Sequence, residues 1–144
     1  MRSKRIQPIA KHADHLQQHA VQIFVAAQQA VVDAQLQLEK LIEYRSEYNK
    51  MRNITHVTVT QLRDYQLFLN KLNLSIEQAK FNIDDKKLQC EQQKINWLKT
   101  RSRSQALDAV IVKYEIQEAQ IMARIEQKEQ DEFASRMAGK SQQK

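Results

Sequence analysis

The residues from 62 to 83, LRDYQLFLNKLNLSIEQAKFNI, decide the fold of this chain. From Leu62, alternate steps of three and four residues reach a series of apolar side chains: Tyr65, Leu69, Leu72, Ile76, Ala79 and Ile83. A seven-residue period of this kind places one apolar stripe along an α-helix that packs against a second helix as a left-handed coiled coil. The stretch therefore predicts a helix that requires another helix beside it.

The same register continues through the rest of the second half of the chain. It first crosses a largely polar stretch at Lys86, Cys90, Gln93, Trp97, Thr100 and Ser104. It then returns to apolar residues at Leu107, Ile111 and Tyr114, passes Glu118, and ends at Ile121 and Ile125. Because no Gly or Pro occurs between Pro8 and Gly139, nothing in this range marks a sharp turn. We expect one helix over residues 60–138.

The first half of the chain carries a weaker stripe with the same period. Its members are Ala20, Phe24, Ala27, Val31, Ala34, Leu38, Leu41 and Tyr48, interrupted by Arg45. The stripe predicts a helix over residues 9–52, followed by a turn at residues 53–60. Thr58 with Gln61 three residues later forms a capping box, a typical start for the second helix. Residues 1–144 then form a single all-α unit, a long antiparallel two-helix coiled coil whose C-terminal helix is the longer.

Closing this hairpin near residues 56–57 predicts which side chains meet across the seam. The expected pairs are Tyr48 with Tyr65, Leu41 with Leu72, Leu38 with Ile76, Val31 with Ile83, and Phe24 with Cys90. In this register the first helix runs out opposite Ser104. The stripe beyond that point has no partner in the chain: Leu107, Ile111, Tyr114, Ile121 and Ile125. An apolar seam on a lone helix implies that another protein covers it.

Composition excludes several classes of function. A chain without glycine before Gly139 has no glycine-rich nucleotide loop, and a two-helix rod offers no concave pocket. We therefore expect no enzyme, no cofactor and no small-molecule substrate. The net charge of +6 comes with no nucleic-acid-binding motif, so we expect no nucleic-acid partner. The single Cys90 suits a reducing cytosol, and no stretch approaches the roughly 18 apolar residues of a membrane span.

Three further residue groups are candidates for sites. His12, His15 and His19 share one helical face, a spacing that could bind a transition metal, but a solvated face near a helix end is the simpler interpretation. We therefore predict no metal site. Cys90 and Trp97 are expected to fill the seam, although Trp97 could also contribute to a partner surface.

Four aromatic residues gather near the predicted turn: Tyr44, Tyr48, Tyr65 and Phe68. Core filling explains Tyr48 and Tyr65, which are seam positions. Tyr44 and Phe68 lie off the strict seam and are expected to be partly exposed. Exposed aromatic residues of this kind favour a protein interface.

Three segments occur in a specific order and spacing: LIEYRSEY at residues 41–48, YQLFL at 65–69 and DEFASR at 131–136. In these segments the chain resembles the FliJ family, small coiled-coil components of the flagellar type III protein-export apparatus. The resemblance implies a fold like the γ-subunit stalk of rotary ATPases. It implies termini inserted into the hexameric export ATPase FliI, which has the regulator FliH, and a turn directed at the export gate FlhA. It also implies escort of unloaded export chaperones, in the cytoplasm and peripherally at the inner membrane of the flagellar base.

The resemblance also implies site residues. The export-gate patch of the family falls on Gln37, Leu41, Tyr44, Tyr48, Phe68 and Leu72. Ser75 and Ala79 occupy further positions of that patch but differ in residue type. For the ATPase interface we expect Leu107, Ile111, Tyr114, Ile121 and Ile125, together with Asp131, Phe133 and Arg136 of the closing segment. Two alternatives remain: the stalk of a virulence-type secretion system, and a generic scaffold that self-associates through residues 105–138.

Overall fold

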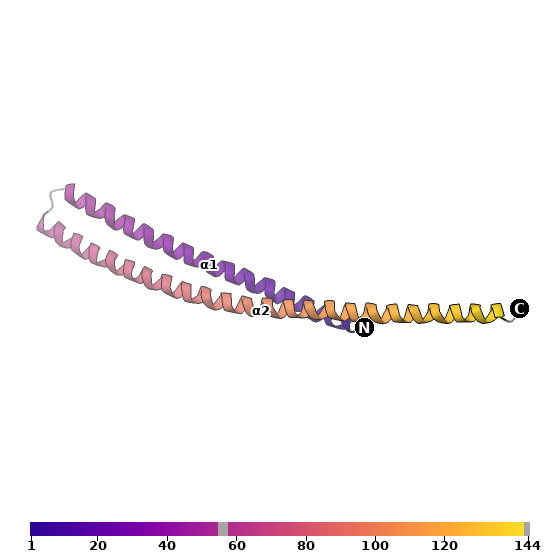
Figure 1. The fold of residues 1–144 in the computed structure, drawn as a ribbon. Coiled ribbons are helices and arrows are strands. Elements are labelled where there is room, and N and C mark those ends of the chain that lie inside the picture. Colours follow the sequence, from indigo (N-terminus) through magenta and orange to yellow (C-terminus); the bar gives the residue numbers. More distant parts are fainter. Residues whose placement is uncertain (55–57, 143–144) are drawn as a thin grey trace. The chain divides into compact units, whose positions relative to one another are not determined.

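The computed structural model of the chain describes residues 1–54 and 58–142, and nearly all of them are helical (Figure 1). Helix α1 comprises Arg2–Ile54 and helix α2 comprises Val59–Gln142. No strand occurs in the described ranges, so the predicted all-α fold is confirmed. The centre of the predicted turn, residues 55–57, lies outside the described residues.

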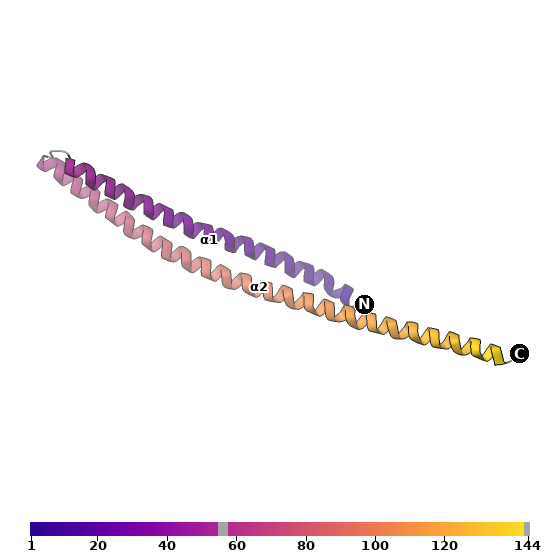
Figure 2. The ribbon, with the colours of Figure 1, turned by 45° about the horizontal axis from the view of Figure 1, so that its top comes forward.

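The contacts divide the chain into two compact units. The hairpin unit is Gln18–Leu98, and the terminal unit combines Met1–Gln17 with Lys99–Lys144. Each unit contains a segment of α1 beside a segment of α2 that runs in the opposite direction (Figures 1 and 2).

The start of α2 has the predicted capping box. The backbone N–H of Thr58 donates to Oε1 of Gln61 at 3.0 Å. In return, the backbone N–H of Gln61 donates to Oγ1 of Thr58 at 3.2 Å. Two N–H groups without a helical acceptor are satisfied in this way, which fixes the residue at which α2 begins.

In the hairpin unit, the predicted seam is the core. On α2 the buried residues are Tyr65, Leu72, Ile76 and Ile83, and on α1 they are Ala20 and Ala34. Ile76 is the most enclosed of them, with 1% of its surface exposed. The polar seam positions Lys86 and Gln93 are half-buried, so the register continues through them as predicted.

The pairing across this seam agrees with the prediction near the turn and differs farther away. The rings of Tyr48 and Tyr65 stack with centroids 4.5 Å apart, as expected. Phe24, however, stacks on Trp97, one heptad beyond its predicted partner Cys90, with centroids 5.6 Å apart. Helical side chains lean toward the N-terminus of their own helix, so side chains on antiparallel helices lean in opposite directions. This lean shifts the contacts of an α1 side chain away from the turn, which is the direction of the change from Cys90 to Trp97.

In the terminal unit, α1 begins at Arg2, well before the predicted start at residue 9. The steps of three and four residues continue backward from Ala20 through the least exposed residues of this segment: Ser3, Ile6, Ala10, Ala13 and Gln17. Pro8 is tolerated because it sits on the exposed face, where its missing N–H removes a hydrogen bond on the solvent side.

This longer α1 corrects one expectation about the second helix. Leu107, Ile111 and Tyr114 were predicted to lack a partner, yet all three are half-buried in the terminal unit. The α1 seam of this unit consists mainly of Ser and Ala, which do not stand out as an apolar stripe in the sequence. Only the part of the stripe at Ile121 and Ile125 is exposed, at 53% and 46%.

Candidate protein-interaction sites

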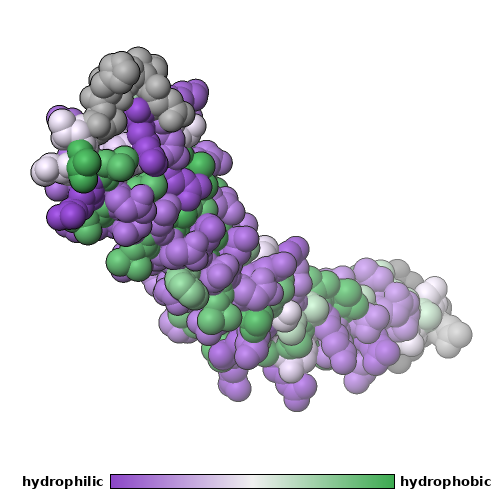
Figure 3. All heavy atoms as spheres, turned by 90° about the vertical axis from the view of Figure 1, so that its left-hand side faces the viewer, coloured by the Kyte–Doolittle hydropathy of each residue, from purple (hydrophilic) through white to green (hydrophobic). Residues whose placement is uncertain are grey.

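An aromatic cluster occupies the turn end of the hairpin unit, where the seam supplies Tyr48 and Tyr65. The ring of Phe68 lies against Tyr48 with centroids 4.5 Å apart, and the rings of Tyr44 and Phe68 meet edge to face with centroids 6.0 Å apart. Tyr44 and Phe68 occupy the same flank of the seam on the two antiparallel helices, which brings their rings together. Figure 3 views the hairpin from this end and shows hydrophobic residues at the surface among hydrophilic ones.

Tyr65 is the fixed member of this cluster. Its hydroxyl lies 3.2 Å from the backbone carbonyl oxygen of Tyr48 and 3.0 Å from Oδ1 of Asn49. The guanidinium of Arg52 stands over its ring, 4.8 Å from the centroid, in a cation–π geometry. With 9% of its surface exposed, Tyr65 supports the cluster rather than contacting a partner.

Tyr44 is the member of the cluster most open to solvent. Half of its surface is exposed, whereas Tyr48 and Phe68 are half-buried. A rigid aromatic ring that is held on one side and open on the other is well suited to an interface, because little conformational entropy is lost on binding. The prediction that Tyr44 and Phe68 are partly exposed therefore agrees with their placement.

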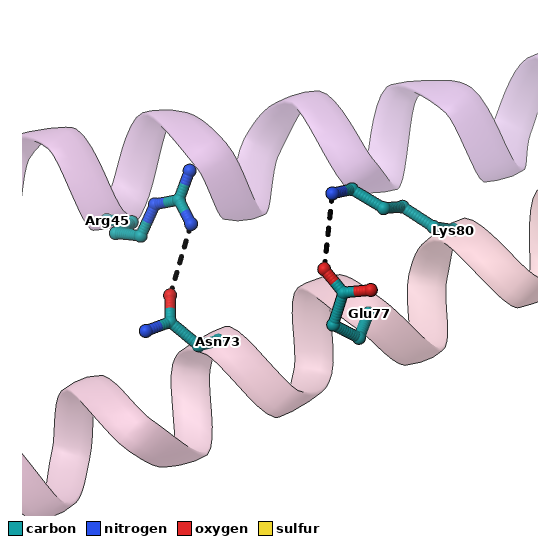
Figure 4. Close-up of polar contacts among 4 residues, drawn as sticks. All are labelled: Arg45, Asn73, Glu77 and Lys80. Atoms are coloured by element: carbon teal, nitrogen blue, oxygen red, sulfur yellow. Dashed lines mark hydrogen bonds and ion pairs between the residues drawn. The ribbon is translucent and has the colours of Figure 1, made fainter.

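Of the other predicted gate residues, some are exposed at the surface and some are buried beneath it. Gln37 is exposed, Leu41 is half-buried, and Leu72 is buried with 7% of its surface exposed. Leu72 therefore packs beneath the exposed residues of this face and supports them. Arg45, which interrupts the apolar stripe, turns its guanidinium to the flank of the seam and donates to Oδ1 of Asn73 at 3.1 Å (Figure 4).

In the terminal unit, a polar closure holds the first turn of α1 against α2. The backbone N–H of Ser3 donates to Oε1 of Glu118 at 3.1 Å, and its hydroxyl donates to Oε2 at 2.6 Å. The hydroxyl and then the backbone hydrogen bond lower the pKa of the Glu118 carboxyl, because both favour its charged form. The guanidinium of Arg2 stands over the ring of Tyr114 at 5.9 Å.

The sequence reasoning missed this closure. Ser3 is in phase with Ala20 when the three-and-four steps are continued backward, and Glu118 was recognised only as a polar interruption of the stripe. Continuing the steps through Ala13 and Ala10 would have found Ser3.

Beyond the closure, α2 continues with no helix beside it in the terminal unit. Every residue from 119 to 141 is exposed. The predicted ATPase-interface residues here are Ile121, Ile125, Asp131, Phe133 and Arg136. Phe133 is the most exposed of the apolar ones, at 66%, and Met137 follows it one turn later at 54%. A helix with exposed large apolar residues has little to stabilise it in water by itself.

The remaining candidates show no sign of a chemical site. Over residues 1–54 and 58–142, no group of three or more His, Cys, Asp or Glu side chains is placed to hold a metal ion. His12, His15 and His19 are all exposed. The Cys90 thiol is free and half-buried, and it borders a small hollow with Gln28 and Val31 of α1. Over residues 1–54 and 58–142, neither helix contains an apolar stretch that would span a bilayer.

Two helices paired through a heptad seam, with aromatic and apolar side chains left at the surface, define a two-helix coiled-coil protein. A family model described as Flagellar FliJ protein matches residues 2–143. The chain therefore belongs to the FliJ family, a family of flagellar export components that is not known as an enzyme family. No curated protein and no solved structure matches the chain.

Proposed function

We propose that this chain is the coiled-coil stalk of the flagellar export apparatus, which promotes assembly of the FliI hexamer and links it to the gate FlhA. The observation that carries the proposal is the exposure of α2 over residues 119–141 in a chain of the FliJ family. A single helix with exposed apolar side chains requires a partner that encloses it, and a ring with a central channel does so on all sides. FliH, as the regulator of the ATPase, and unloaded export chaperones are the further partners proposed.

The ATPase contact is proposed at the exposed residues of α2. Ile121, Ile125 and Phe133 supply apolar surface, and Asp131 and Arg136 supply charge beside it. Leu107, Ile111 and Tyr114 are half-buried against α1, so they take part only if the first turns of α1 separate from α2. The proposed location is the cytoplasmic face of the inner membrane at the flagellar base.

Replacing Ile125 and Phe133 together by Asp tests this contact. Because a charged side chain buried without a partner is strongly disfavoured, the double variant should lose at least tenfold in its stimulation of FliI hexamer formation and ATP hydrolysis. Helicity by circular dichroism should stay near that of the wild type, since both residues are exposed. The matched control is Val25→Asp with Val32→Asp, which adds the same charge at exposed residues of the hairpin unit.

A double variant that stimulates FliI like the wild type would contradict the proposal. The scaffold alternative predicts a different result. The purified chain alone should have the mass of an oligomer, and Ile125→Asp with Phe133→Asp should convert it to a monomer. The virulence-type alternative is disfavoured by the match to a flagellar family.

The gate contact is proposed at the aromatic cluster, with Tyr44 and Phe68 as the contacting rings beside Gln37 and Leu41. Tyr44→Ala with Phe68→Ala should weaken binding to FlhA by about 2 kcal/mol, which is the usual loss at an interface hot spot. Titration calorimetry with the soluble part of FlhA measures this loss. Val25→Ala with Val32→Ala is the control, and gate binding that is equal in both double variants would remove the cluster from the function.

A further inference from the structure

The outer face of α2 in the hairpin unit carries large apolar residues at strict intervals of seven. This outer stripe comprises Leu67, Leu74, Phe81, Leu88 and Ile95. Their exposed fractions are 55%, 60%, 73%, 60% and 48%, so none of them contributes to the seam. The stripe lies at neither of the two surfaces of the proposed function.

The outer stripe is unusual because it occupies the heptad position that faces away from the partner helix. Single exposed apolar residues are ordinary on protein surfaces, but the position of a heptad that faces away from the partner helix is usually polar. Among the described residues of the hairpin unit, no other outward-facing position keeps large apolar side chains for more than two successive heptads. At about 1.5 Å per residue, the five residues mark a line of about 42 Å along the helix.

One flank of the outer stripe is an acidic row. Glu77, Asp84 and Glu91 also repeat every seven residues, and all three are exposed. Lys80 pairs with Glu77 at 3.2 Å, and the two side chains are 54% and 60% exposed (Figure 4). An exposed ion pair of this kind contributes little to the free energy of folding. Glu77 can therefore leave Lys80 and bind a Lys or Arg of a partner with little loss of stability.

The charges disfavour a second copy of this chain as the occupant. Two copies packed antiparallel through the outer stripe would place each acidic row against the same row of the other copy, because equivalent flanks meet across a twofold axis. Two copies packed parallel would place the acidic row against the opposite flank of the hairpin unit, whose charges cancel: Lys71, Gln78, Asp85 and Gln92. Neither arrangement offers charge complementarity.

We propose that the outer stripe binds an amphipathic helix of another protein that has a seven-residue apolar repeat flanked by Lys or Arg. The repeat follows from geometry, because the outer stripe winds with the left-handed seam and only a heptad-repeating helix can stay on it. The basic flank follows from Glu77, Asp84 and Glu91. The inference goes beyond the stalk function and rests on different residues.

Two synthetic helical peptides of 28 residues test this inference. Both carry Leu at the two seam positions of every heptad, one has Lys at the flanking positions and the other has Glu. Fluorescence anisotropy with the full chain should show binding of the Lys peptide in preference to the Glu peptide. Leu74→Gln, Phe81→Gln and Leu88→Gln together should weaken that binding more than tenfold, while Val25→Gln, Val32→Gln and Leu36→Gln together should not.

A second variant separates charge recognition from general apolar adhesion. Glu77→Lys, Asp84→Lys and Glu91→Lys together should reverse the preference, so that the Glu peptide binds more tightly. The inference is overturned if the wild type binds neither peptide, if both Gln variants lose binding equally, or if the charge reversal changes nothing. It is also overturned if the chain alone is a dimer that only the outer-stripe Gln variant dissociates, since the occupant would then be a second copy. The outer-stripe Gln variant should stimulate FliI as the wild type does. Failure of the outer-stripe inference can therefore be told apart from failure of the stalk function.

Discussion

The hairpin unit buries large side chains between its helices, whereas the terminal unit buries mainly small ones. Leu72, Ile76 and Ile83 fill the first seam, and Ala10, Ala13 and Ser104 fill the second. Fully burying an Ile or Leu side chain stabilises by roughly 1.5–3 kcal/mol, and a single methyl-sized group by about 0.8 kcal/mol. Small residues let two helices lie close together, but they leave the pairing weak. The first turns of α1 are thus the part of the seam expected to separate from α2 first.

The largest expected effect is at the centre of the stronger seam. Ile76→Ala removes the most enclosed side chain among the described residues and should lower the free energy of unfolding by about 3 kcal/mol. Urea denaturation followed by circular dichroism measures it. Leu74→Ala, two residues away and 60% exposed, is the matched control and should cost no more than about 0.5 kcal/mol.

The corresponding change in the weaker seam should have a smaller effect. Ala13→Gly should cost about 1 kcal/mol, mostly through helix propensity. Equal losses for Ile76→Ala and Ala13→Gly would contradict the difference between the two seams.

The smallest expected effect concerns the polar closure at the start of α1. Because the folded-state pKa of Glu118 is lowered from its ordinary value of 4.5, its contribution is present above that value and is lost as the pH falls through the lowered pKa. Amide hydrogen exchange at residues 4–17 should therefore gain protection above pH 4.5 relative to a Glu118→Gln variant measured at the same pH. A Glu118→Gln variant with unchanged protection at neutral pH would show that the closure does not hold this segment.

The heptad pattern predicted the larger seam well, because large apolar residues mark their own positions. Every expected seam residue of α2 from Tyr65 to Glu118 is buried or half-buried. The pattern did not predict the seam at the start of α1. Ser3, Ala10 and Ala13 are small, and small residues also occur often on exposed helix faces. The Phe24–Trp97 stack was missed for another reason, since the lean of side chains along two antiparallel helices is not visible in a list of positions.

The candidate sites were predictable in part. The exposed ring of Tyr44 and the exposed residues Ile121 and Ile125 followed from their positions relative to the seam. The seam register also predicted the burial of Leu72, whereas the family patch places the same residue at the gate interface. Position relative to the seam marks these surfaces as exposed, and the partners FlhA and FliI come from the family resemblance.

The half-buried thiol of Cys90 gives the chain a built-in chemical reporter. A thiol reagent reaches a seam position mainly when the two helices part, so its labelling rate measures how often that layer opens. Since the sequence contains one cysteine, no second thiol contributes to the signal and no substitution is needed. A partner that holds the hairpin closed should slow the labelling, and one that separates the helices should speed it, so the rate reports how binding changes the opening of this layer.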